Sequence, residues 1–393
     1  MSRKNQRGFA LPAAIGGLVI VGVLVTAGFY MARQELRIGV ASRNAGLAVN
    51  IAQSGANDVL VNYTSSLASL STWDSTTLTD TVEGGIWSAT VTKVASRIFF
   101  LDVTADVTEG GSLWAGASRR MGLVARITSA DINPPAALTT QGGLKYGGSA
   151  EVHGLDEMPD GSSGGLADWT SLCDSTAMTD KPGILIDDTL NIDWNGNRNK
   201  IEDNMTGTPV FDQDPTITVE SLMSFGDMSW EQMVDLADVT YTSAPGTPGA
   251  VLDNGRCDIT VKDNWGEPVD NTHDCFTYFP IIYFNNPGWT VQLSGGIGQG
   301  ILMVEGDLKV TGGFEFYGPV FVKGTLTTMG SGGHFWGGVV AANANIETNT
   351  VLGNAVITYS SCSIERALLN NSSLTQIRPV AMRSWVDLTN VVN

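Results

Sequence analysis

Residues 7–14 read RGFALPAA, and they open an apolar run that continues as IGGLVIVGVLVTAGFYMA to residue 32. Arg3, Lys4 and Arg7 supply positive charge at the start, and no charged side chain occurs from Phe9 to Ala32. At about 1.5 Å of helical rise per residue, a stretch of this length crosses a hydrocarbon layer of about 30 Å. The sequence therefore predicts a single membrane-spanning helix with its basic end cytoplasmic and the rest of the chain exported.

The residues that follow the apolar run distinguish a lasting helix from a cleaved secretory signal. A signal peptide would have a shorter apolar core that ends in a small-residue cleavage site, and no such site follows here. Residues 33–63 instead keep apolar side chains at helical spacing. These side chains are Leu36, Val40, Leu47, Ile51 and Val59. We therefore expect one unbroken helix over residues 9–66, apolar at first and amphipathic later.

The basic leader, the Gly8–Phe9 junction and the long helix together resemble a type IV prepilin. FALP at residues 9–12 and NIAQSGANDVL at residues 50–60 most resemble PilX-type minor pilins and GspK-like pseudopilins. The resemblance covers residues 1–60 and implies that a prepilin peptidase cuts after Gly8, leaving residues 1–8 as the leader. It also implies that Phe9 becomes an N-methylated N-terminus and that the helix packs in a filament core.

Ala13 departs from the pattern of the major pilins, which have Glu at the fifth position after the cut. A carboxylate is costly in lipid unless a partner pairs with it, and in that family the partner is thought to be a neighbouring subunit's amine. Minor pilins of the tip or initiation complex also lack this Glu. The resemblance therefore implies a tip or initiation position, with other pilin subunits, the prepilin peptidase and an inner-membrane assembly platform as partners.

The composition favours a β-rich region after the helix. Gly occurs 46 times in 393 residues, and charged residues make up only 16%. The formal net charge of −18 would repel nucleic-acid phosphates, so we exclude nucleic acid as a partner. We predict an α+β fold in which an antiparallel sheet and a small β-solenoid-like head follow the helix.

Patterns along the chain divide this β-rich region into four parts. Residues 67–133 alternate partly between apolar and polar side chains and predict an antiparallel module of pilin type. Pro134 and Pro135 end it, and residues 134–300 are expected to form a folded insertion. One helix is expected within residues 218–238, with Thr218, Ser221 or Ser229 as its cap.

Residues 301–360 contain an internal repeat with a period of about 18 residues. Val304-x-Gly306-x-Leu308 recurs as Val322-x-Gly324-x-Leu326, and FEFYG and HFWGG follow at matching places. Short apolar strands at this period predict the rungs of a small parallel β-solenoid, with an antiparallel meander as the alternative. Residues 142–155 look like an earlier rung, and residues 361–393, with a short helix, are expected to cap the open end.

The four cysteines are far apart and form no CxxC pair, so their spacing does not predict a metal site. In an exported chain an even number of cysteines favours disulfides, although free buried thiols are the alternative. Three pairings exist. The short loop favours Cys257 with Cys275, which leaves Cys173 with Cys362.

No catalytic motif is present in the sequence, and we predict that the protein is not an enzyme. His153, His273 and His334 lie in unrelated contexts, and the adjacent Asp187 and Asp188 would point to opposite faces of a strand. One stretch, DWNGNRNKIEDN, places oxygen ligands at alternate positions, which can wrap Ca²⁺. The ligands would be Asp193, Asn195, Asn197 and Asn199; an Asn-rich turn is the other interpretation.

These features favour a minor pilin or pseudopilin whose exported head acts as a cap or as an adhesin for a surface or glycan ligand. Such a protein stands in the inner membrane as a single-pass subunit and then in a pilus, outside the cell or in the periplasm. Two alternatives remain. The first is an anchored periplasmic or surface binding protein outside any filament, and the second is an anchored carbohydrate-active enzyme.

Overall fold

A computed structural model describes residues 10–62, 64–108, 117–159, 169, 173, 178–343, 348–380 and 385–389. The chain forms two compact units. The first, Met1–Ile127 with Gln376–Asn393, is called the helix–sheet unit below. The second, Thr128–Thr375, is called the coil unit. The Gly8–Phe9 junction lies outside the described residues.

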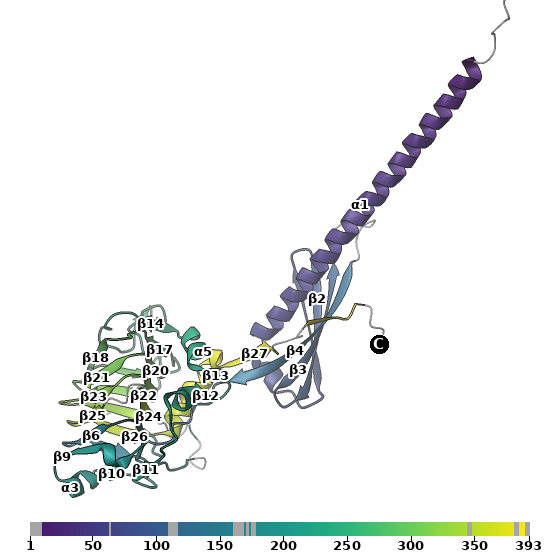
Figure 1. Cartoon of the computed structure of the whole chain (residues 1–393). Coiled ribbons are helices and arrows are strands. Elements are labelled where there is room, and N and C mark those ends of the chain that lie inside the picture. Colours follow the sequence, from purple (N-terminus) through teal and green to yellow (C-terminus); the bar gives the residue numbers. More distant parts are fainter. Residues whose placement is uncertain are drawn as a thin grey trace, which may run out of the picture. The chain divides into compact units, whose positions relative to one another are not determined.

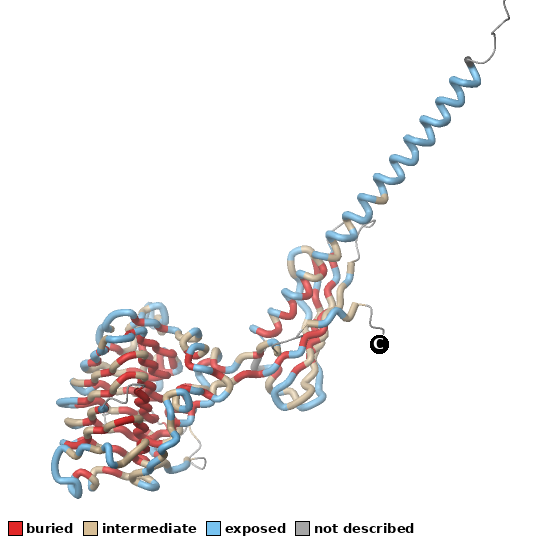
Figure 2. Tube along the Cα trace, in the orientation of Figure 1, coloured by how far each residue is buried: buried red, intermediate tan, exposed pale blue. Residues whose placement is uncertain are grey.

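Helix α1 (Ala10–Asn62) runs for 53 residues without interruption (Figure 1). Its length confirms the long N-terminal helix, and Pro12 is tolerated because the first turn has no intrahelical acceptor for its missing N–H. Fourteen large apolar side chains between Leu11 and Ile38 are exposed, and Figure 2 shows this part of the helix in pale blue. From Ala48 onward one face of the helix is buried. A short helix, α2 (Thr64–Ala68), follows.

Four antiparallel strands in chain order form the sheet of the helix–sheet unit. Alternate residues of β2, including Trp87, Ala89 and Val91, are buried in the core that also contains Ile51 and Val59 of α1. This alternation is typical of an antiparallel sheet with one covered face. The strands are β1 (Ser75–Val82), β2 (Gly85–Ala95), β3 (Ile98–Val107) and β4 (Ser118–Ser129).

The end of the chain returns to this sheet. β27 (Thr375–Pro379) and β28 (Trp385–Asp387) both pair with β4. We had expected residues 361–393 to cap the solenoid, but only the part up to Thr375 belongs to the coil unit. The physical reason is that β4 ends the meander with an unpaired edge, and the C-terminal strands supply its missing backbone hydrogen bonds.

The coil unit is a stack of β-coils that builds one parallel sheet of 12 strands and another of 6 (Figure 1). The repeat predicts the register correctly: Val304 pairs with Val322, and Leu308 pairs with Leu326. The described pairs between coils are parallel, so the antiparallel alternative is wrong. The main coil strands are β17 (Ile281–Phe284), β18 (Thr290–Ser294), β19 (Ile297–Gln299), β20 (Ile301–Val304), β21 (Asp307–Thr311), β22 (Phe314–Val322), β23 (Leu326–Thr328), β24 (Gly333–Ala342), β25 (Asn349–Val351) and β26 (Val356–Tyr359).

The stack is not built in chain order. β5 (Leu138–Gln141) pairs with β24, β6 (Leu144–Gly147) with β25, and β7 (Glu151–His153) with β26. The earliest coil therefore stacks on the last one. Further strands continue the stack beyond it: β8 (Ile184–Ile186), β9 (Ile192–Asn195), β10 (Met205–Thr206) and β11 (Phe211–Gln213).

We had expected residues 134–300 to form a folded insertion, and these pairings show a different arrangement. Its strands belong to the same two sheets as residues 301–360. The segment after β11 leads to β14 (Val239–Tyr241), which pairs with β17 at the other end of the 12-stranded sheet. It contains two short helices, where we had expected one, because a hairpin separates them. They are α4 (Val219–Leu222) and α5 (Trp230–Asp235), separated by β12 (Ser224–Phe225) and β13 (Met228–Ser229).

Side chains of this connecting segment cover one face of the stack. Phe225 packs edge-on against Phe321, with ring centroids 4.8 Å apart. Trp230 donates a hydrogen bond from Nε1 to Glu305, at 2.8 Å, and Lys323 lies over the Trp230 ring. Thr218 and Ser229 both form capping boxes, as the sequence predicts for two of its candidate caps.

Candidate functional site

The exposed apolar part of α1 is the largest feature of the helix–sheet unit that its own residues leave uncovered. The helix is long and apolar enough to cross a membrane, with a most apolar 18-residue window of mean hydropathy 2.2 that has no buried residue. Burying one Leu, Ile, Val, Phe or Met side chain contributes about 1.5–3 kcal/mol. Covering the fourteen exposed apolar side chains with lipid or with other helices would therefore be strongly favourable.

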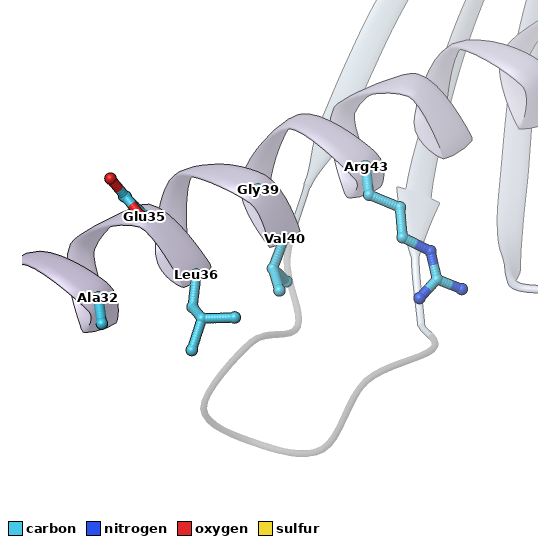
Figure 3. A pocket seen from close by; sticks show the side chains of 6 residues that line it. All are labelled: Ala32, Glu35, Leu36, Gly39, Val40 and Arg43. Carbon is cyan, nitrogen blue, oxygen red and sulfur yellow. The ribbon is translucent and has the colours of Figure 1, made fainter.

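A shallow groove on α1 lies where the apolar segment gives way to the packed segment (Figure 3). Ala32, Leu36 and Val40 follow one another along the same side of the helix, and Arg43 lies one turn further on. Glu35 points away from this strip. Small and branched side chains on one face let a second helix approach closely. This face is therefore suited to helix packing rather than to holding a small molecule.

The two units differ strongly in charge. The coil unit contains 31 of the 40 acidic residues and 9 of the 22 basic ones, which gives a formal net charge of −22. The helix–sheet unit contains the remaining 9 acidic and 13 basic residues, a formal net charge of +4. The acidic character of the sequence therefore belongs to the coil unit alone. A basic or neutral partner suits that unit better than an anionic one.

Both predicted disulfides are present in the coil unit. Cys257 bonds Cys275 with a Cα–Cα distance of 4.8 Å, and Cys173 bonds Cys362 with a Cα–Cα distance of 5.6 Å. The first closes a loop beside the hairpin of β15 (Leu252–Asp253) and β16 (Arg256–Cys257). The second ties residue 173 to α6 (Ser361–Leu369), which begins after the cap Ser360.

An aromatic cluster lies beside the second disulfide. Arg366 is buried among Trp169, Phe276 and Phe279, with its guanidinium carbon 4.3–4.8 Å from the three ring centroids. Burial lowers the pKa of Arg366 to about 10, because the cation has lost water. Sequence analysis missed this cluster, since its members are scattered over residues 169–366 and no motif connects them.

Two residues of the predicted calcium loop make other contacts in the structure. Asp193 and Asn195 are exposed on β9, and Asp193 lies 4.0 Å from Lys145. Asn197 caps α3 (Arg198–Glu202), with its side-chain oxygen accepting from the N–H of Asn199. Its oxygen therefore already has a backbone partner, as in an ordinary Asn turn.

The acids and histidines considered for catalysis have structural contacts in the described part of the chain. Asp187 accepts from the N–H of Gly142, and Asp188 caps the 3₁₀ turn Thr189–Asn191. His153 lies 3.2 Å from both Glu151 and Thr206. His273 accepts a hydrogen bond from the N–H of Cys275 in a tight turn, and His334 lies opposite Glu315 in the register of β22 and β24. Within the described residues no group of three or more His, Cys, Asp or Glu side chains could hold a metal.

Comparisons with known proteins add little to this description. No family model matches the chain, and no curated protein matches it. Among solved structures, the chain is similar to the crystal structure of the competence-associated pilin ComZ from Thermus thermophilus. The two are 13% identical over 88% of this chain and 97% of that one, with a TM-score of 0.23. A score this low establishes no shared fold, and the proposals below rest on the chain itself.

Proposed function

We propose that the chain is a minor pilin or pseudopilin of a type IV pilus or a type II secretion-like filament. The observation that carries this proposal is the division of α1 into an exposed apolar part and a part packed on a sheet. A simple lipid anchor needs only the first part. A helix that continues into the exported sheet also couples the membrane anchor to that sheet, which suits a subunit that is moved out of the membrane.

In this proposal α1 first crosses the inner membrane, with its N-terminus cytoplasmic, and then leaves lipid for a bundle of sister helices. The apolar side chains stay covered in both places, so the transfer replaces one apolar environment with another. The strip of Ala32, Leu36 and Val40 supplies the part of the contact nearest the sheet. The prepilin peptidase, the assembly platform and other pilin subunits would be its partners.

We place the subunit at the tip or in the initiation complex. Ala13 offers no carboxylate for an earlier subunit's amine, and the coil unit adds a large acidic body to the pilin-like part. Such a body would be accommodated at an end of a filament more easily than along its side. The coil unit would act there as a cap or adhesive head, without catalysis of its own.

The decisive experiment is mass spectrometry of the mature protein from its host. We expect loss of residues 1–8 and a methylated Phe9 at the new N-terminus. Gly8→Ala should leave the leader in place, whereas the control Gly16→Ala, at a position with open space around it, should be processed normally. An intact, unmethylated N-terminus in the wild-type protein would instead support an anchored binding protein outside any filament.

A further inference from the structure

The two ends of the coil stack differ in how their strand edges are covered. At the end formed by β14, β18 and β19, the chain's own segments cover two of the three strands. The carbonyl of Thr240 in β14 accepts a hydrogen bond from Nζ of Lys262 at 3.1 Å, and residues 248–265 run beside β19. The N–H of Ile297 donates to the carbonyl of Pro248 at 3.1 Å, and the N–H of Gln299 donates to the carbonyl of Trp265 at 2.8 Å.

β18 has no such cover within the described residues. It ends the six-stranded sheet and pairs with β21 along one edge. The N–H of Gly295 donates to Thr311 of that neighbouring chain segment at 3.2 Å. Because alternate residues of a parallel strand bond to the same side, Val291 and Leu293 also bond toward β21. The backbone N–H and carbonyl of Gln292 therefore face the open edge.

The strand is firmly held and yet carries none of the features that usually block an edge. Val291 and Leu293 are fully buried, which fixes the strand against the coil below it. Thr290, Gln292 and Ser294 are exposed. The sequence TVQLS contains no charge, no proline and no bulge, which are the common devices against strand addition at an edge.

The opposite end of the same sheet is protected. There the edge strand is β9, and it carries the charged side chain of Asp193 close to Lys145. α3 follows directly, and the Arg198 guanidinium lies 5.1 Å from the Trp194 ring centroid. Charge and a following helix disfavour strand addition at this end. The contrast makes the bare edge of β18 a specific feature and not a general property of the stack.

We infer that β18 is a strand-addition site for an extended segment of a different protein. The incoming strand would bond to the free backbone groups of Gln292 and its alternate neighbours, as in other cases of β-augmentation. The formal charge of −22 on the coil unit disfavours a second copy of this chain, since two such heads repel each other. This charge favours a basic partner segment, and pairing as a strand favours a segment rich in β-branched residues.

The test uses the full chain in detergent micelles and a fluorescein-labelled synthetic peptide, Lys-Thr-Val-Thr-Val-Thr-Val-Lys. We expect the amide of Gln292 to exchange with solvent at least 100-fold faster than that of Leu293, and the peptide to slow it. Gln292→Pro, which removes the open-edge N–H, should weaken peptide binding at least tenfold by fluorescence anisotropy. Gln292→Ala keeps that N–H and should bind like the wild type.

Three results would overturn the inference. The first is slow exchange at Gln292 in the free protein, which would show that the chain already covers this edge. The second is the absence of peptide binding to the wild type. The third is equal binding by the proline and alanine variants. If thermal unfolding shows that Gln292→Pro is misfolded, the exchange comparison on the wild-type chain decides alone.

Discussion

The helix–sheet unit and the coil unit build β-structure in opposite ways. In the first, β1 to β4 pair with their neighbours in sequence through short turns, and one helix covers the sheet. In the second, residues 138–141 pair with residues 339–342, so the contact closes a loop of roughly 200 residues. The first unit can form locally, whereas the second needs most of its chain before its coils can stack.

The two units are also stabilised by different interactions. All four cysteines lie in the coil unit, where disulfides reduce the entropy cost of long loops. The coil unit also has a column of close-packed glycines with positive φ, Gly300, Gly318 and Gly337, in successive coils. The helix–sheet unit relies instead on apolar packing between α1 and its sheet. A substitution that removes one of these interactions should therefore destabilise the unit that contains it and leave the other unit unchanged.

Reduction of the disulfides should have the largest effect. For residues 189 and 18 apart, the chain-entropy relation gives about 5 and about 3 kcal/mol. We expect dithiothreitol, or Cys173→Ser with Cys362→Ser, to loosen the coil unit, measured as faster amide exchange over residues 281–342. Exchange over residues 85–107 should stay unchanged, because that unit has no cysteine. Equal loosening of both units would contradict this separation.

Gly318→Ala should be the next most damaging change. At φ +137° an L side chain is strained, and its Cβ would clash with the carbonyl oxygen of Gly300. We expect a loss of about 3 kcal/mol or more in the unfolding free energy of the coil unit.

Gly313→Ala is the matched control for this change. Gly313 also has positive φ but has open space around it, so strain alone should cost about 1–2 kcal/mol. Chemical denaturation followed by amide exchange separates the two variants. Similar losses would mean that the coils are not packed this closely at Gly318.

The sequence could predict those parts of the fold whose signals are local. The apolar run predicted α1, alternation predicted the antiparallel strands, and Val304 and Leu308 with their repeats predicted the coil register. The pairing of residues 138–153 with the last coil could not be predicted. A repeat shows that segments are alike, but not which of them are neighbours in space. The return of β27 and β28 to β4 has no local signal either, because it depends on an unpaired edge far away in the chain.

For the candidate site, too, only features with a local signal could be predicted from the sequence. The apolar face of α1 could be read from residues in one segment, and short loop length suggested one disulfide and left the other by elimination. The open edge of β18 could not be predicted, because it depends on what the rest of the chain leaves uncovered. The spacing of oxygen ligands from Asp193 to Asn199 suggested a calcium site. The sequence could not show that Asn197 caps α3 or that Asp193 is exposed, because both depend on the folded backbone.

Gly55→Ala should break the packing of the helix–sheet unit and spare the coils. A Cβ at Gly55 would lie 2.5 Å from Cγ of the buried Trp87, so the helix would have to move away from the sheet. We expect a loss of about 1–3 kcal/mol.

The control for Gly55→Ala is Gly46→Ala, which lies in the same helix with open space around it. It should stabilise the unit by about 0.5–1 kcal/mol, because Ala restricts the unfolded chain. Thermal unfolding followed by near-ultraviolet circular dichroism distinguishes the pair. A stabilising Gly55→Ala would show that α1 is further from the sheet than the structure has it.

Acid should weaken the coil unit more than the helix–sheet unit, and this is the smallest effect we expect. Hydrogen bonds from the Thr hydroxyl, and then from the Thr N–H, two residues on, lower the pKa of Asp214, Asp258 and Asp270. In the helix–sheet unit, hydrogen bonds from Thr389 lower the pKa of Asp387 in the same way. Because the folded pKa lies below the unfolded value of about 3.9, this stabilisation is present above about pH 4. It disappears as the pH falls through the folded pKa.

Thr260→Val tests one of these turns, since it removes the hydroxyl that donates to Asp258 at 2.6 Å. Between pH 5 and about pH 2.5 the melting temperature of this variant should fall less steeply than that of the wild type, because the pKa of Asp258 moves back toward its ordinary value. Thr327→Val, on the outer face of β23, should keep the wild-type dependence of melting temperature on pH. Among the described residues, no carboxylate accepts a hydrogen bond from the Thr327 hydroxyl. If Thr260→Val keeps the wild-type slope as well, the acid sensitivity does not come from this turn.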